Sequence, residues 1–163
     1  MEKEVGMKKR VVVWLIGTDG ILQGKIMLQR RSDSGLYQAT WNGELKEKES
    51  PFEAIQRKVK EELGEEFLKN YPFSSLIPIR TIKTKSENGQ EMISCHWMGP
   101  LKEENIRLIK LHVSASLLFS LGKEQEIYPL SSGKDLKKNI VLFDDDFKIL
   151  KEEVFPQIEL TFR

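Results

Sequence analysis

Ser50-Pro51 and Gly64 bound one helix, and this helix constrains the fold more than any other feature of the sequence. Serine is a preferred N-cap, proline suits the first helical position, and glycine commonly follows the last helical residue. Apolar residues recur between these limits every three or four positions, at Phe52, Ile55, Val59 and Leu63. The spacing predicts an amphipathic helix that packs on a core along one stripe.

Apolar, β-branched runs predict strands on both sides of this helix. The predicted strands cover residues 11–16, 25–29, 76–82, 92–98 and 126–130. Turn residues at 17–20 join the first two runs into a hairpin, and a polar turn at 86–89 joins the third and fourth. Residues 30–42 show no periodicity, so we expect a loop there.

The ends of the chain and one internal segment complete the predicted order. Residues 1–9 are charged and are expected to form a loose lead-in. Residues 101–122 stay open between strand and helix, although LIKLHV at 108–113 favours a strand. Residues 144–154 predict a helix, with Asp144-Asp145-Asp146 as its N-cap and first turn. The order ββαββ, mixed, α predicts a single α/β domain over residues 1–163, with helices packed on a mixed sheet.

Composition excludes several classes of partner. The chain has 26 basic and 25 acidic residues, so no overall charge favours a nucleic acid polymer or an anionic membrane. The apolar run VVVWLIG is too short to span a bilayer, and the charged N-terminus is not a secretory signal. Cys95 is the only cysteine and cannot form an internal disulfide. We therefore expect a cytoplasmic protein.

Of two adjacent carboxylates on the predicted helix, Glu61 lies about opposite the apolar stripe and Glu62 flanks it, so both point away from the packed side. Arg57 lies one turn earlier and can brace Glu61. Clustered carboxylates on a rigid helix suit a hard cation, Mg²⁺ or Mn²⁺, that bridges to substrate phosphates. The alternative is a solvated helix face in which Arg57–Glu61 and Lys58–Glu62 form ordinary i,i+4 pairs.

A longer pattern contains this helix. It consists of a glycine, five residues, a glutamate, seven residues, an arginine and a short acidic run, at Gly43, Glu49, Arg57, Val59, Glu61, Glu62 and Gly64. The pattern resembles the Nudix box, the signature of the Nudix hydrolase family. The preceding stretch, IMLQRRSDSGLYQATWNGELKEKES, is similar to the isopentenyl-diphosphate-isomerase-like branch of that family, with Tyr37 at a tryptophan place and Glu44 at a histidine place.

The resemblance implies a fold and an activity. The fold would be the Nudix α/β/α sandwich, with a mixed β-sheet between helices. The activity would be MutT-like, a Mg²⁺-dependent hydrolysis of a diphosphate linkage in a nucleoside diphosphate derivative. Glu61 and Glu62 would hold the metal and take part in catalysis, and Arg57 would orient them. Gly43 and Glu49 would support the loop, and members of the family commonly form dimers.

Lys58 departs from the family pattern, which has a catalytic, metal-binding glutamate at this place. A lysine ammonium about 5 Å from a divalent ion is repelled by roughly 6–7 kcal/mol at an effective dielectric constant near 20, an upper bound because lysine can reach water. We therefore expect weaker Mg²⁺ binding and slow or absent hydrolysis. The alternative function is a catalytically impaired Nudix-fold module that binds a nucleotide or regulates. Glu65 also replaces an apolar residue of the pattern, a local packing change.

Other residues are weaker candidates. Arg30 can contact a phosphate, or serve with Arg31 as a basic pair at a sheet edge. Tyr37 and Trp41 can stack on a base or simply pack in the core. Two further carboxylates that the family resemblance brings into consideration are Glu91 and Glu126.

Two histidines and the cysteine are expected to be structural. His96 and His112 have no second histidine or cysteine at a spacing suited to a metal. The related isomerases use a cysteine ahead of the box, and Cys95 follows it. Isomerase activity is therefore disfavoured.

Overall fold

The computed structural model of the chain describes residues 7–31, 37–39, 41–85, 89–112, 123–129 and 144–157. Its strands are β1 (Lys8–Gly17), β2 (Lys25–Arg31), β3 (Tyr37–Ala39), β4 (Trp41–Glu44), β5 (Ile77–Lys85), β6 (Glu91–Leu101) and β7 (Lys123–Pro129). Its α-helices are α2 (Pro51–Leu63), α3 (Glu65–Asn70), α4 (Glu103–His112) and α6 (Asp144–Ile149). Short turns are η1 (Gly20–Leu22), η2 (Phe73–Ser75) and the π-helical η4 (Leu150–Val154).

β1 lies at the centre of a mixed, 7-stranded sheet among the described residues. One edge of β1 pairs antiparallel with β4 near its start and with β2 near its end. The other edge pairs in parallel with β6, which in turn pairs antiparallel with β5. β3 and β7 extend the sheet from β2. Parallel pairing of β1 with β6 requires a long crossover, and the chain between them supplies it.

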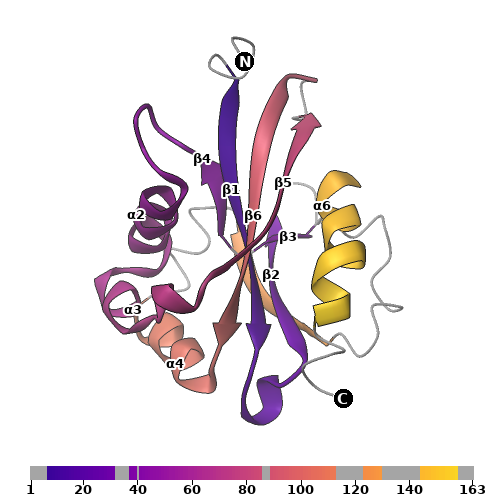
Figure 1. Ribbon diagram of the computed structural model, residues 1–163. Helices are drawn as coiled ribbons and strands as arrows, with labels where there is room; N and C mark the ends of the chain where they lie inside the picture. Colours follow the sequence, from indigo (N-terminus) through magenta and orange to yellow (C-terminus); the bar gives the residue numbers. More distant parts are fainter. Residues whose placement is uncertain are drawn as a thin grey trace.

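Helices cover both faces of this sheet (Figure 1). α2, α3 and α4 lie on one face, and α6 lies on the other. Side chains alternate along β1, so Val11, Val13 and Leu15 belong to the core under α2, whereas Val12 and Trp14 belong to the core under α6. The predicted α/β/α sandwich with a mixed sheet between helices is confirmed.

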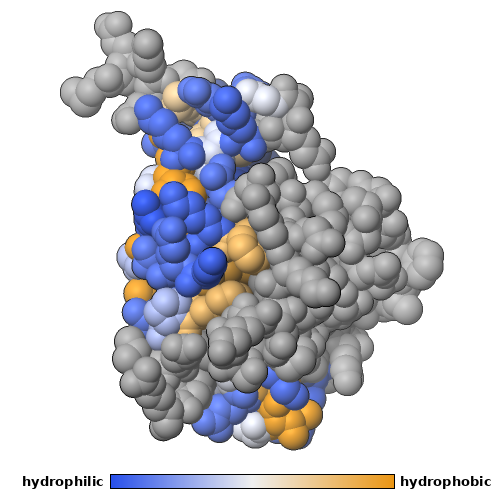
Figure 2. All heavy atoms as spheres, turned by 90° about the vertical axis from the view of Figure 1, so that its right-hand side faces the viewer, coloured by the Kyte–Doolittle hydropathy of each residue, from blue (hydrophilic) through white to orange (hydrophobic). Residues whose placement is uncertain are grey.

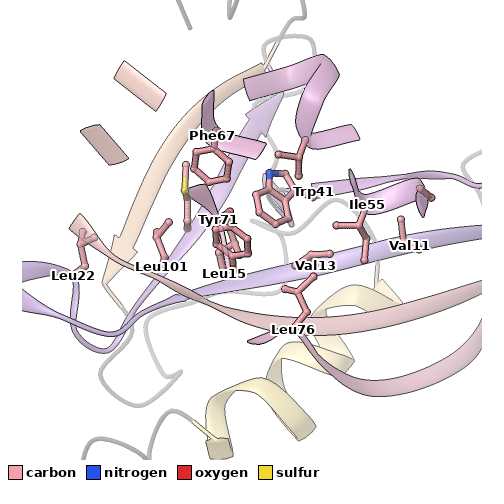
Figure 3. Packing of buried hydrophobic residues seen from close by; sticks show 13 residues of the cluster. Val11, Val13, Leu15, Leu22, Trp41, Ile55, Phe67, Tyr71, Leu76 and Leu101 are labelled. Carbon is pink, nitrogen blue, oxygen red and sulfur yellow. The ribbon is translucent and has the colours of Figure 1, made fainter. Parts of the chain in front are cut away.

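Aromatic rings fill the core beneath the first layer of helices (Figure 3). The ring of Trp41 meets Phe67 edge to face at 5.7 Å between centroids and Tyr71 at 5.0 Å. The Tyr71 hydroxyl donates to the carbonyl of Pro100 at 2.6 Å, and burial raises the pKa of this phenol. Edge-to-face contacts add to the stabilisation that burial of these large rings supplies.

The predicted helix forms as α2. The Ser50 hydroxyl accepts a hydrogen bond from the backbone N–H of Glu53 at 3.1 Å, which caps the first turn. Gly64 ends the helix with a φ of 90°, a value that glycine adopts without strain. Ile55 and Val59 are fully buried, but Phe52 is 37% exposed and lies beside Phe73.

All five predicted strands are confirmed, and most are longer than expected. For the described part of residues 30–42 the expected loop is wrong, because residues 30–31, 37–39 and 41–42 belong to the paired strands β2, β3 and β4. The strand favoured at 108–113 is also wrong for its described part, since α4 runs to His112. Residues 113–122 and 86–88 lie outside the described residues. α3, directly after Gly64, is an element that the sequence analysis did not predict.

The predicted C-terminal helix is confirmed as α6 and η4, but Asp146 does not cap it. Asp146 is fully buried, and its Oδ1 accepts a hydrogen bond from Arg10 Nη2 of β1 at 2.5 Å. Arg10 Nε donates to the Ser94 hydroxyl of β6 at 2.7 Å. Burial raises the pKa of Asp146, while the Arg10 guanidinium acts in the opposite direction. This pair ties α6 to the sheet.

His96 lies beside this ion pair and has a structural role. Its Nδ1 accepts a hydrogen bond from Trp14 Nε1 at 3.1 Å, and its side chain is fully buried. The indole nitrogen can only donate, so His96 is neutral with its proton on Nε2. Burial lowers the pKa of His96 to about 3, helped by the charges of Arg10 and Arg80.

The surface beside α6 is mixed (Figure 2). Where the structure describes it, hydrophilic residues cover most of this face, and hydrophobic surface shows in its middle as well as at its lower end. Ile21 of η1 is 75% exposed and Ile77 of β5 is 58% exposed.

The flexible lead-in expected at 1–9 is wrong for Lys8 and Lys9, which belong to β1, and residues 1–6 are outside the described part. Among the described helices, none has the length and apolar composition needed to cross a bilayer.

Candidate active site at helix α2

Arg57 and Glu49 form the strongest polar contact of the candidate site. Arg57 Nε donates to Glu49 Oε2 at 2.9 Å, and Arg57 Nη2 donates to Glu49 Oε1 at 3.0 Å. The two side chains are 21% and 12% exposed. Two parallel bonds of this kind fix the guanidinium plane as well as its position. α2 is thereby joined to the loop that precedes it.

Both oxygens of the Glu49 carboxylate accept hydrogen bonds from within the protein. Its Oε1 also accepts from the backbone N–H of Lys46 at 3.0 Å. The hydrogen bond from Arg57, followed by the Lys46 N–H, lowers the pKa of Glu49 to about 2. Glu49 raises the pKa of Arg57 in return. Glu49 therefore supports the loop, and its oxygens are already used by hydrogen bonds within the protein.

Arg57 also reaches the other components of the site. Its Nη2 donates to the carbonyl of Glu44 at the end of β4, at 3.0 Å. Its Nη1 donates to Glu61 Oε1 at 3.4 Å, a longer and weaker contact. The Glu61 side chain is 51% exposed. Arg57 thus restrains the Glu61 carboxylate without using all of its capacity to accept hydrogen bonds.

Lys58 lies against Gly43. A methyl group built on Gly43 would be 2.6 Å from Cε of Lys58, 3.0 Å from its Cδ and 3.3 Å from its Nζ. Gly43 pairs with Val11 of β1, so the lysine crosses from α2 to β4 directly over the sheet. A larger residue at position 43 would displace the end of this lysine side chain. The ammonium of Lys58, the residue that takes the place of the family's metal-binding glutamate, consequently lies beside Gly43 of β4.

The structure places several other candidates by their backbone alone. Glu62 lies in the last turn of α2. Arg30 of β2 stands opposite Tyr37 of β3, which brings these two candidates together at one register position. Glu126 of β7 stands opposite Leu28. The side chains of Glu62, Arg30, Tyr37 and Glu126 lie outside the described part of the structure.

Trp41 and Glu91 occupy different surroundings. Trp41 is fully buried among Phe67 and Tyr71, so its ring packs in the core and has no face open to a base. Glu91 is exposed at the start of β6, opposite Lys85 of β5. The structure therefore supports core packing for Trp41 and not stacking on a base.

A divalent cation fits the chemistry of the described carboxylate at this site. The exposed carboxylate of Glu61 offers hard oxygen ligands of the kind that Mg²⁺ prefers. Within the described residues, no group of three or more histidine, cysteine, aspartate or glutamate side chains is placed to hold a metal. Lys58 adds a positive charge at the same loop. Among the described side chains, Glu61 therefore supplies hard oxygen ligands at this site, and the Glu62 side chain lies outside the described part.

The Glu49–Arg57 pair is the contact that sequence analysis did not anticipate. Glu49 precedes the helix, so no helical spacing relates it to Arg57. A glutamate just before the N-cap and an arginine two turns later are nevertheless a usable signal, because a long side chain can reach back along the helix.

Comparison with known proteins identifies the fold family. Residues 7–116 match the NUDIX domain, which is more than half of the chain. No curated protein matches the sequence closely enough for comparison.

Solved structures share the fold at low sequence identity. A mutT/nudix family protein from Listeria innocua has a TM-score of 0.61 and 20% identity, covering 95% of this chain and 96% of its own. The NUDIX domain of Shewanella oneidensis NrtR, complexed with ADP ribose, has a TM-score of 0.61 and 14% identity, covering 95% and 89%. A binary complex of C. elegans Ap4A hydrolase has a TM-score of 0.61 and 14% identity, covering 96% and 100%.

Proposed function

Because the chain belongs to the Nudix family, we propose that it hydrolyses a diphosphate linkage in a nucleoside diphosphate derivative, with turnover lowered by Lys58. The observation that carries this proposal is the arrangement around Arg57. One guanidinium joins the loop at Glu49, the end of β4 at Glu44, and the exposed carboxylate of Glu61. A carboxylate so held faces solvent at the edge of a rigid loop.

Each residue has a role in the proposed site. Glu61 and Glu62 would hold Mg²⁺ or Mn²⁺, and the bound ion would neutralise a diphosphate and favour ionisation of a water molecule. Arg57 limits the rotation of Glu61, and Glu49 fixes Arg57. Gly43 lets the loop backbone lie close to α2. The Lys58 ammonium lowers metal affinity by repulsion and offers a direct contact to a phosphate oxygen.

The nature of the substrate is proposed from chemistry and from the structural neighbours. Carboxylates that bind a hard cation, next to a lysine and an arginine, suit a diphosphate. The neighbours include a domain complexed with ADP ribose and an Ap4A hydrolase, and both of these compounds contain adenosine attached to linked phosphates. The near-balance of 26 basic and 25 acidic residues supports a small molecule over a nucleic acid polymer. A cytoplasmic location and a homodimer stay predictions.

A second function is favoured by Lys58 itself. Its stem fills the space over Gly43, so its charge stays at the loop where the family pattern has a glutamate. In this alternative the protein is a Nudix-fold module that binds a nucleotide derivative or regulates, without efficient turnover. The resemblance to the isopentenyl-diphosphate-isomerase-like branch adds no isomerase activity, because Cys95 follows the box.

A substrate panel tests the proposed function. Wild-type protein is incubated with ADP-ribose and dinucleoside polyphosphates in the presence of Mg²⁺ or Mn²⁺, and released phosphate or nucleotide is measured. Slow cleavage that is lost in Glu62→Gln supports the hydrolase. Binding of the same compounds by calorimetry, without cleavage, supports the binding module. Cleavage that is unaffected by Glu62→Gln would overturn the assignment of the site.

A further inference from the structure

A pocket of about 460 Å³ opens between the sheet and the loop that leads into α2. Its walls include Leu45 and Pro51 from the loop, Lys9 from β1, Ile93 and Cys95 from β6, and Lys83 from β5. We call it the loop pocket. Its volume lies within the range of sites that bind small ligands. Glu49 also lines the pocket and is the one lining residue that the proposed diphosphate site shares.

The register of the sheet builds the floor of the loop pocket. Lys9 stands opposite Ile93, and Ile93 stands opposite Lys83, so the three residues form one row across β1, β6 and β5. Cys95 and Thr81 form the next row on the same face. Neighbouring strands are about 4.8 Å apart, which separates the backbones of the two lysines by about 10 Å. Both flexible side chains can converge on one anion placed over Ile93.

The electrostatic balance of the loop pocket is positive. Within the described part of the chain, neither Lys9 nor Lys83 has an ion-pair partner. Glu49 also lines the pocket, but hydrogen bonds from Arg57 and the Lys46 backbone engage both of its oxygens. Two lysine charges therefore face the pocket without an opposing free carboxylate among the described lining residues.

Apolar groups form the other wall. Leu45 and Pro51 stand across from Ile93, and the backbone N–H of Leu45 donates to the carbonyl of Lys9 at 2.8 Å, which holds the loop over the sheet. Pro51 is the first residue of α2, so the positive end of the helix dipole adjoins the pocket. An apolar body between these residues would place an anionic group at the lysines.

From this arrangement we propose that the loop pocket is a second ligand site, which binds a small phosphate monoester with an apolar body. The charge of a phosphate monoester, about −1.5 to −2 at neutral pH, matches the two lysines. Its apolar body packs between Leu45, Pro51 and Ile93. The proposal does not depend on hydrolysis at α2.

Cys95 supplies a built-in reporter for this site. It is the only cysteine in the chain, is partly buried and lines the loop pocket. A bound ligand would shield its thiol. The rate at which iodoacetamide alkylates Cys95, followed by mass spectrometry, therefore reports occupancy of the pocket, provided that global unfolding is excluded by a parallel unfolding curve.

Phenyl phosphate is the probe, and benzyl alcohol is the neutral control. We expect phenyl phosphate to slow Cys95 alkylation saturably and to shift the amide NMR signals of Lys9, Ile93 and Thr81. Lys9→Gln/Lys83→Gln should weaken binding by about tenfold or more, because two charge-assisted contacts are lost. Lys85→Gln, two residues further on β5 and outside the lining, should bind as wild type does.

Several outcomes of the alkylation and binding measurements would overturn the proposal. They are the absence of saturable protection, equal protection by benzyl alcohol, and undiminished binding in the double lysine variant. Glu61→Gln separates the two sites, because it should leave phenyl phosphate binding unchanged even if no hydrolysis is found at α2. Signal shifts that centre on Glu61 in place of Ile93 would also contradict a second site.

Discussion

The stem of Lys58 occupies the space that a side chain at Gly43 would need, with Cε only 2.6 Å from the position of a built methyl group. This contact ties the residue that departs from the family pattern to the first residue of that pattern. It also explains why glycine suits this position of β4: the neighbour is a lysine side chain that crosses over the strand.

Gly43→Ala is predicted to displace Lys58. The cost to the free energy of unfolding should be about 1 kcal/mol or less, because the end of a flexible side chain can move. In a Lys58→Ala background the same substitution should cost nothing measurable, so a double-mutant cycle by urea unfolding should show coupling. Lys60→Ala, on the exposed side of α2, is the matched control and should leave the cost of Gly43→Ala unchanged. Additive costs in the Lys58 cycle would contradict the contact.

Glu49 is predicted to make folding stability sensitive to acid. Its pKa falls from an ordinary value of 4.5 to about 2 in the folded protein, because Arg57 and the Lys46 N–H bind the ionised form. A lowered folded-state pKa gives stability that is present above 4.5 and is lost as the pH falls toward 2. Glu49→Gln should remove this contribution, seen as a shallower fall of stability in that window. Glu47→Gln, an exposed neighbour, serves as control, and identical pH profiles for wild type and Glu49→Gln would refute the prediction.

His96 is predicted to stay neutral in the folded protein while it titrates normally in the unfolded chain. Its pKa falls from 6.5 to about 3, so the unfolded state binds more protons and stability falls as the pH drops below 6.5. His96→Gln should reduce this slope. Imidazole ¹⁵N NMR at neutral pH should show His96 protonated at Nε2 only, because Trp14 donates to Nδ1. A protonated Nδ1 would contradict the assignment.

Asp146 is predicted to be essential for docking of α6. Asp146→Asn would leave the buried Arg10 guanidinium without its carboxylate, at a cost of about 3–5 kcal/mol in the free energy of unfolding. Asp145→Asn, at a less buried neighbouring position, should cost far less. Chemical unfolding of both variants measures the difference. Equal, small costs would show that the ion pair does not hold the helix.

The parts of the fold that were predicted correctly have strong local signals. α2 has a cap at each end and an apolar stripe, and β1 and β6 are long apolar runs. β3 and β4 have only three and four residues, and they are strands because β2 and β1 offer partners. α3 is short and depends on Phe67 packing into the aromatic core. Such elements depend on contacts that are distant in sequence.

The same difference between local and distant signals holds for the side-chain contacts of the candidate site and of α6. The spacing of Arg57 and Glu61 on one helix made their contact predictable. The stronger Arg57–Glu49 pair joins a helix to a loop, and Asp146 meets Arg10 across 136 positions of the chain. Neither contact follows from local periodicity. Composition and pattern therefore indicated the helix that carries the site but not the side chains that hold it in place.

The most direct test of the proposed role of Lys58 is a Mn²⁺ titration of the wild type and Lys58→Glu, monitored by electron paramagnetic resonance. Lys58→Gln separates removal of the cation from gain of a ligand, and Lys60→Glu controls for a general change of charge on α2. Hydrolysis of ADP-ribose by the same four proteins is measured in parallel. We predict Mn²⁺ binding at least about tenfold tighter in Lys58→Glu, a change of about 1.4 kcal/mol, together with faster hydrolysis. Equal affinity and equal rate in wild type and Lys58→Glu would contradict the claim that Lys58 weakens this site.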